Sequence, residues 1–316
     1  MPRRTQLRVL GLLKRSYSTQ HRFQPLECLD SCDLDTFRAQ YFTLGTPVIL
    51  RNHSRSISAI EKWFIPSNDN SSTKELNISY LEQYDSAIVP LELTRSTAGP
   101  GTPSGPATTT SFERLEAPLS LFLTFTSAQG QLDQNHDPGS ETRLYLAQHS
   151  LGDLPLGLRT DLEPVPELVL KAGKGDIYGS SLWLGRPPTR TPLHRDPNPN
   201  LFLQLAGEKV VRLMRPEIGR AVYERIRQEV SEMGGDTVGS ANIRGEEMMV
   251  GEEQERIEEA VWGDSKEEKH GEGEEGEEGW EAKLESGDAL FIPLGWWHSV
   301  RGVGRGVTGS VNYWFR

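Results

Sequence analysis

Three candidate metal ligands constrain how this chain can fold, because they lie in two segments that are far apart in the sequence. His194 and Asp196 stand two residues apart, so on a strand both side chains would project from one face while Arg195 points away. His298 lies in a second segment, after the short apolar run 289–292 and a turn that contains proline and glycine. One ion could be held by all three only if two antiparallel strands closed over each other. Two imidazoles and one carboxylate are the ligand set that holds a redox-active iron and leaves one face open.

Further residues keep register with these candidate ligands. Taken alone, the triplet 194–196 would also suit a polar surface loop in a proline-rich stretch. The additional positions are Thr191, Asn200, Gln204 and Lys209 around the first segment, the strand-like run 143–146 upstream, and the run 311–315 near the C-terminus. In this order they resemble the JmjC or cupin-like family of iron and 2-oxoglutarate dependent oxygenases, and most of all its asparaginyl hydroxylases. The resemblance covers residues 23–316 and implies a double-stranded β-helix, or jelly roll, as the core.

The resemblance assigns a metal and an oxo-acid to this core. It implies three ligands for iron(II), which are also the expected catalytic residues: His194, Asp196 and His298. 2-Oxoglutarate and dioxygen would be the co-substrates. The far carboxylate of 2-oxoglutarate would be bound by the charge of Lys209 and by the hydroxyls of Tyr145 and Thr191.

Three more positions match residues that the family places close to the iron. Asn200 and Asn312 match amides near the metal and the bound oxo-acid, where an amide can donate to a carboxylate without changing the charge. Trp314 matches an aromatic residue that packs beside the ligands. Each position also has an ordinary structural explanation, since Lys209 could be a solvated strand lysine and Tyr145 a half-buried strand aromatic. The shared register of the matching positions favours the functional interpretation.

The resemblance also implies an activity. Oxidative decarboxylation of 2-oxoglutarate at the metal would be coupled to hydroxylation of an unactivated C–H bond, while the protein orients the reactants and excludes water. A protein side chain is the expected substrate. The alternatives are JmjC-type demethylation, oxidation of RNA or of a small molecule, and a non-catalytic cupin that serves as a scaffold or binding module.

An acidic insertion separates the two halves of the candidate metal site. Residues 246–285 contain 17 acidic and 4 basic residues, a net charge of −13, whereas the whole chain carries −11. The rest of the chain therefore carries a net charge of +2. We expect no broad basic surface on the barrel for binding nucleic acid. We expect the stretch 231–285, rich in Gly and Glu, to be a disordered low-complexity loop, with docking of a basic partner as the alternative.

Residues 1–22 differ in composition from the rest of the chain. They contain six basic residues, several Ser and Thr, and no acid, and apolar residues recur at helical spacing from Leu7 to Tyr17. This composition predicts a mitochondrial transit segment. The alternatives are a disordered basic tail or an arm directed to RNA or the nucleus, in a cytoplasmic or nuclear protein.

The remaining sequence indicates one mainly β domain (α+β) with an α-helical N-terminal part. With 31 Gly and 20 Pro in 316 residues, the composition suits a fold rich in strands and turns better than a helical bundle. No apolar run approaches the roughly 20 residues that span a bilayer, so no membrane-embedded form is expected. Cys28 and Cys32 are expected to be reduced thiols. Because the chain stops at Arg316, without the helices through which the asparaginyl hydroxylases dimerise, we expect a monomer.

Local patterns predict the elements that precede the barrel. A helix is expected over 33–42, capped by Ser31 or Asp33, and a strand over 45–51. Residues 94–110 are rich in Gly, Pro, Ser and Thr, a composition that predicts a flexible loop. Further helices are predicted at 58–64, 78–84, 112–127 and 217–230, and further strands at 87–94 and 143–148.

Overall fold

The computed structural model describes most of the chain, and the predicted transit segment 1–22 lies outside that part. The middle of the predicted loop 94–110 and two stretches of the predicted insertion 231–285 also lie outside it. The described residues are 23–67, 72–98, 108–132, 140–233, 249, 251–263 and 279–316.

Eight consecutive strands form the core, and they are distributed over two sheets. The order is β13-β12-β15-β10 in one sheet and β14-β11-β16-β9 in the other, so the chain changes sheet at each step except from β12 to β13. This arrangement is a jelly roll, which confirms the prediction of a mainly β fold. The strands are β9 (Ile177–Gly185), β10 (Thr189–Arg195), β11 (Asn200–Ala206), β12 (Glu208–Met214), β13 (Gly279–Leu284), β14 (Ala289–Ile292), β15 (Trp297–Val303) and β16 (Thr308–Phe315).

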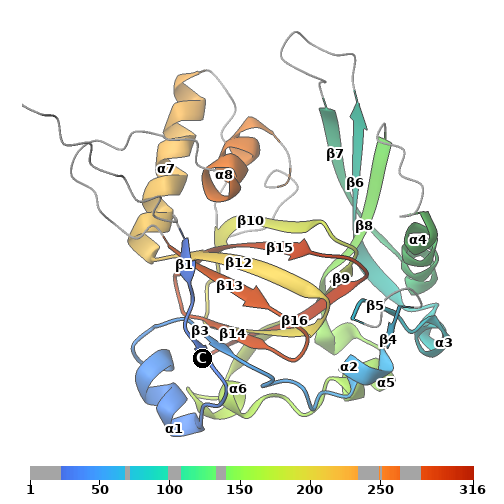
Figure 1. Cartoon of the computed structure of the whole chain (residues 1–316), viewed down its shortest axis with the longest axis horizontal. Coiled ribbons are helices and arrows are strands. Elements are labelled where there is room, and N and C mark those ends of the chain that lie inside the picture. Colours follow the sequence, from blue (N-terminus) through green and yellow to red (C-terminus); the bar gives the residue numbers. More distant parts are fainter. Residues whose placement is uncertain are drawn as a thin grey trace, which may run out of the picture.

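Strands from the N-terminal part widen both sheets (Figure 1). β1 (Phe23–Pro25) pairs in parallel with β13 at the edge of the smaller sheet. The larger sheet gains β3 (Val48–Leu50) and β2 (Cys28–Leu29) beyond β14. On its other side it gains β8 (Ser140–Ser150), β6 (Ile88–Ala98) and β7 (Thr108–Pro118), while β4 (Phe64–Pro66) and β5 (Lys74–Leu76) form a separate pair.

Most of the helices that accompany the sheets are short. The N-terminal ones are α1 (Leu34–Thr36), the π-helical η1 (Phe37–Phe42), α2 (Ala59–Lys62), α3 (Ile78–Leu81) and η2 (Glu82–Tyr84). They are followed by α4 (Leu119–Leu132), η3 (Leu151–Asp153), α5 (Leu156–Asp161), α6 (Glu167–Lys171), α7 (Pro216–Glu232) and α8 (Glu252–Trp262). The longest helices in the described part of the chain are α4 and α7. None of the helices in the described part of the chain is both long and apolar enough to cross a membrane.

The central strand β11 shows how the core positions polar side chains. It is buried along its whole length, as expected of a strand covered on both faces. Three leucines face the core cluster that also contains side chains of the N-terminal helices: Leu201, Leu203 and Leu205. Phe202 instead packs between the two sheets. Because successive side chains alternate between faces, Asn200 and Gln204 share the interior face with Phe202.

The helices α7 and α8 cover the outer face of the smaller sheet (Figure 1). The expected helix 217–230 is present as α7, but the expectation that 231–285 is one disordered loop is wrong for two of its parts. Residues 252–262 form α8, and residues 279–284 form β13, which pairs with β12. Within the glutamate-rich text of α8, Ile257 and Val261 stand four apart and are buried. Together with Ala260 and Trp262, these residues pack α8 against the sheet, a contact that composition alone does not reveal.

The region before the barrel follows the predictions in part. The helix expected over 33–42 begins at the Asp33 cap, whose Oδ1 accepts a hydrogen bond from the Thr36 amide at 2.9 Å. The flexible-loop prediction for 94–110 is wrong at both ends, because β6 continues to residue 98 and β7 starts at residue 108. The helix predicted over 112–127 is wrong up to Pro118, where β7 ends, and α4 starts at the next residue. The threonines at 108–110 are compatible with a strand. Beyond them, the pairing of β7 with β6 outweighs the helical spacing that predicted a helix from residue 112.

A buried carboxylate ties the N-terminal helices together. Asp161, which is 2% exposed, accepts hydrogen bonds from Lys62 Nζ at 2.6 Å and Trp63 Nε1 at 2.9 Å. It also accepts one from the hydroxyl of Tyr80 at 2.5 Å. Burial alone would raise the pKa of Asp161, but these hydrogen bonds outweigh it and hold the pKa below its ordinary value. The group is therefore a structural anion that stabilises the contact of α5 with α2 and α3.

Candidate metal centre

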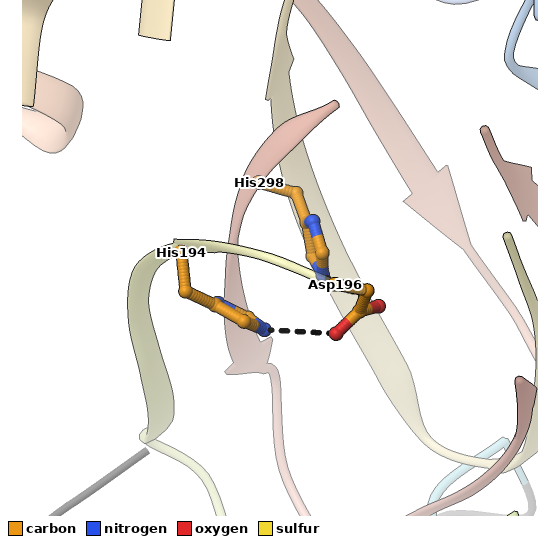
Figure 2. A group of neighbouring side chains, drawn as sticks. All are labelled: His194, Asp196 and His298. Carbon is orange, nitrogen blue, oxygen red and sulfur yellow. Dashed lines mark ion pairs between the residues drawn. The ribbon is translucent and has the colours of Figure 1, made fainter. Parts of the chain in front are cut away.

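Two neighbouring strands bring the candidate ligands together (Figure 2). His194 on β10 lies directly opposite His298 on β15, and Asp196 follows one residue after the end of β10. The Nε2 atom of His194 lies 3.8 Å from Asp196 Oδ1, and that of His298 lies 3.6 Å from Asp196 Oδ2. Two ligand atoms held about 2.1 Å from one ion can be at most about 4.2 Å apart, so both pairs are within reach of a shared ion. The ligand atoms of all three residues lie within 4.8 Å of one another.

Backbone carbonyls orient both imidazoles. His194 Nδ1 lies 2.8 Å from the carbonyl of Pro192, and His298 Nδ1 lies 3.3 Å from the carbonyl of Trp296. A carbonyl can only accept, so each Nδ1 is the donor, and in a neutral imidazole this leaves the lone pair of Nε2 available to a metal. A neutral imidazole pair with one carboxylate fits a divalent cation and leaves it with positive charge.

The three ligands differ in their access to solvent. The side chains of His194 and Asp196 are 19% and 11% exposed, whereas that of His298 is 3% exposed. The site is therefore closed on the His298 side and open beside His194.

A chain of amides holds the carboxylate ligand. Asn200 Nδ2 donates to Asp196 Oδ2 at 2.8 Å, and Asn312 Nδ2 donates to Asn200 Oδ1 at 2.9 Å. Both amides are buried. The structure thus places Asn200 next to the candidate ligand Asp196 and Asn312 one step behind it, and the predicted role of both amides at a metal and a bound oxo-acid stays a prediction. Because a donor to a carboxylate fixes its direction, Asn200 orients the carboxylate of the candidate ligand Asp196.

A buried lysine lies deeper in the same barrel. Lys209 on β12 is 3% exposed, and its Nζ donates to the hydroxyl of Ser310 at 2.7 Å and to that of Tyr145 at 3.3 Å. The ring of Phe202 has its centroid 5.2 Å from the same Nζ. A buried ammonium group with hydroxyls beside it is a donor set suited to a small carboxylate. Of the predicted anion-binding residues, the structure brings Lys209 and Tyr145 into contact.

The other predicted residues face the same interior. Thr191 lies opposite Val300 on β15, two residues from His298 and on the same face. Trp314 lies opposite Asn200, and its indole nitrogen is buried with no hydrogen-bond partner among the described residues. The roles assigned to Thr191 and Trp314 at the oxo-acid stay predictions.

Two residues of the site were missed by sequence reasoning. Ser310 contacts Lys209, and its position two residues before Asn312 on a strand could have indicated the same face. Gly185 allows the Tyr145 ring to lie across β9, because a Cβ atom at Gly185 would overlap Tyr145 Cδ2. Glycine inside a strand pattern indicates such a close approach.

Comparison with known proteins agrees with this architecture. A family model described as a cupin-like domain matches residues 34–316. Lysine-specific demethylase JMJ30 of Arabidopsis thaliana is 26% identical over 311 residues, which are 98% of this chain and 58% of that protein. Lysine-specific demethylase 8 of Danio rerio is 28% identical over 173 residues, or 54% of this chain and 36% of that protein.

A third relative is similar over most of the chain. Jumonji C domain-containing protein 5 of Drosophila melanogaster is 24% identical over 293 residues, which are 91% of this chain and 59% of that protein. The chain spans less than two thirds of the length of each of these three relatives. The likeness to asparaginyl hydroxylases in particular is not tested by these matches and stays a prediction.

Proposed function

The chain belongs to the cupin-like domain family, as its resemblance to JmjC and cupin-like proteins predicts, and we propose that it is an iron(II) and 2-oxoglutarate dependent oxygenase acting on a protein side chain. One observation carries the proposal. A two-histidine, one-carboxylate centre and a buried lysine with its hydroxyl partners lie inside the same barrel. The first group suits iron, and the second suits the far carboxylate of a dicarboxylic oxo-acid.

The residues that line these two groups would each have a definite role in such a reaction. Bound iron would supply, with 2-oxoglutarate and dioxygen, the oxidising power for inserting one oxygen atom into a C–H bond, and 2-oxoglutarate would leave as succinate and carbon dioxide. His194, Asp196 and His298 would hold the metal through Nε2 and carboxylate oxygens. Lys209 and Tyr145 would fix the direction of the oxo-acid. Closure on the His298 side excludes water from the interior, so the substrate would approach from the open His194 side.

Two versions of the substrate chemistry fit this site. Hydroxylation of a side-chain carbon is the version that the sequence predicts. Demethylation is the second candidate, because two of the relatives are named lysine-specific demethylases. Both begin with hydroxylation of a C–H bond, and a hydroxylated N-methyl group is then lost as formaldehyde. The product therefore distinguishes the two: a protein that gains one oxygen atom, or a protein that loses a methyl group with release of formaldehyde.

The test is turnover of 2-oxoglutarate by the purified protein. We expect succinate to form when ferrous iron, 2-oxoglutarate and a cell extract containing candidate protein substrates are supplied, and His194→Ala to abolish it. His53→Ala is the matched control, because it removes a partly buried imidazole outside the metal centre and should leave turnover intact. Iron binding without any succinate formation would favour the scaffold alternative instead.

We also propose, from composition alone, that residues 1–22 direct import into mitochondria. The alternative locations are the cytoplasm and the nucleus. The monomeric state stays a prediction in the same way.

A further inference from the structure

The helix α8 covers the outer face of the sheet that carries the metal ligands (Figure 1). Its buried residues Ile257 and Val261 belong to one apolar cluster with Leu193 and Trp297, each of which is next to a histidine ligand in the sequence. The insertion between β12 and β13 therefore reaches the back of the metal centre. Its last helical residue, Trp262, makes the most specific contacts.

Trp262 is locked in place by two arginines. The guanidinium carbons of Arg212 and Arg301 lie 4.5 Å and 4.3 Å from the centroid of its ring. Each guanidinium is held in turn, because Arg212 Nε donates to Glu281 at 3.0 Å and Arg301 Nε donates to Glu258 at 3.0 Å. An indole that packs against two restrained cations has little freedom to rotate, so the direction of its N–H bond is fixed.

That N–H bond begins a chain of hydrogen bonds across the two ligand strands. Trp262 Nε1 donates to Ser299 Oγ at 2.8 Å, and Ser299 Oγ donates to the carbonyl of Thr191 at 2.9 Å. An indole nitrogen can only donate and a carbonyl can only accept, so the polarity of the chain is determined. Ser299 is 1% exposed and directly follows His298, so water does not compete for these bonds.

The chain ends where the strand pairing of β10 is irregular. Pairing is regular up to Thr191 and resumes at His194, so two residues of β10, Pro192 and Leu193, face Ser299 alone. This is a β-bulge, and Pro192 has no N–H group with which to pair. The hydroxyl of Ser299 supplies a cross-strand bond at this interruption.

The bulge also sets the geometry of a metal ligand. The carbonyl of Pro192 accepts the hydrogen bond from His194 Nδ1 at 2.8 Å. We propose that Trp262 and Ser299 are positioning residues, which hold the bulge so that this carbonyl keeps His194 in the tautomer with Nε2 available to a metal. The proposal deepens the proposed function and rests on it for the metal, whereas the tautomer is a property of the metal-free protein.

Two substitutions remove the chain of hydrogen bonds at different points. Trp262→Phe keeps an aromatic ring between the arginines but removes the N–H donor, and Ser299→Ala removes the hydroxyl. In the metal-free protein, nitrogen-15 NMR of the histidine side chains reports which nitrogen of His194 carries the proton. We expect both variants to reduce the share of the Nδ1–H tautomer. We also expect cobalt(II), used as the probe metal, to bind about tenfold more weakly with an altered visible absorption spectrum.

Matched controls separate positioning from general stability. Ser286→Ala removes a serine hydroxyl that donates to the Leu205 carbonyl at 2.6 Å, outside the metal strands. Trp280→Phe changes a tryptophan on β13, in the sheet that carries the two histidines. The ring of Trp280 contacts Arg215, whose guanidinium carbon lies 5.1 Å from the ring centroid. Both controls should keep the His194 tautomer and the affinity for cobalt(II), even where the melting temperature falls.

The outcomes are distinguishable. If Trp262 acts through Ser299, the double variant binds cobalt(II) no more weakly than Ser299→Ala alone. If both single variants lower only the melting temperature and keep the tautomer, the affinity and the spectrum of the wild type, the proposal is overturned and α8 is only a cover. If the wild type binds no cobalt(II), the proposed function fails, and the tautomer of His194 still decides whether Trp262 and Ser299 position the ring.

Discussion

Substitution of the buried Asn200 tests how the carboxylate of the candidate ligand Asp196 is held. Asn200 is 1% exposed and donates to Asp196 Oδ2 at 2.8 Å, while its own oxygen accepts from Asn312 at 2.9 Å. Asn200→Ala removes the donor and leaves the ligand free to rotate. The carboxylate would then have to be oriented by the metal itself.

The expected magnitude follows from the type of bond. A hydrogen bond to a charged acceptor contributes about 1.5–3 kcal/mol, and each 1.4 kcal/mol or so is a factor of ten in affinity. Asn200→Ala should therefore weaken metal binding by roughly 10- to 150-fold. The substitution also leaves the buried Asn312 amide without its acceptor, which costs about 1–3 kcal/mol of the free energy of unfolding.

Calorimetric titration with manganese(II) or cobalt(II) measures the first effect, and urea denaturation measures the second. Gln204→Leu is the matched control, since this buried amide lies on the same strand and face but donates to Ala206 and Thr308. The control should lose stability and keep its metal affinity. Unchanged metal affinity in Asn200→Ala would refute the idea that the amide orients Asp196.

Four further predictions concern other parts of the chain. Lys209→Ala should raise the concentration of 2-oxoglutarate needed for half-maximal succinate formation by roughly 10-fold or more, because it removes the cation proposed to bind the far carboxylate of 2-oxoglutarate. The metal affinity should stay unchanged. Gly185→Ala should have the same effect, because the added Cβ atom would displace the Tyr145 ring. A variant that needs the same concentration of 2-oxoglutarate as the wild type would contradict the proposed role of Tyr145. Asp161, with its lowered pKa, contributes stability that is present above about pH 4 and is lost as the pH falls through its folded-state pKa, so Asp161→Asn should flatten the pH dependence of the free energy of unfolding below that pH. Mass spectrometry of the mature protein should show an N-terminus near residue 23, and an intact Met1 would contradict the transit-segment prediction.

That the three candidate ligands lie close together could be predicted from the sequence, because strand pairing is a strong constraint. His194 lies on β10 opposite His298, as an antiparallel pairing predicts, whereas Asp196 lies just beyond the end of β10 and not on the strand itself. The structure adds what spacing does not encode. The bulge at Pro192 depends on the pairing partner of β10, so no local pattern in β10 reveals that its carbonyl orients His194.

The errors have a common physical origin. Glutamates dominate the composition of α8 and indicate disorder, yet the helix docks because Ile257 and Val261 are buried and Ala260 and Trp262 pack against the same cluster. The ends of the predicted loop 94–110 became strands because β6 and β7 pair with each other, a contribution that composition does not report. Ser310 follows the same rule, since a serine in a strand carries no signal until its neighbour Lys209 across the barrel is known.

The uneven exposure of the two histidines has a kinetic consequence for the metal. An ion leaves such a centre stepwise, as water replaces one ligand at a time, and the first bond to exchange is the one that water can reach. With His194 19% exposed and His298 3% exposed, a metal held by the proposed ligands would lose its first bond at His194. A chelator would then attack from the side proposed for the substrate, so under the proposed function an occupied substrate site should slow the loss of metal.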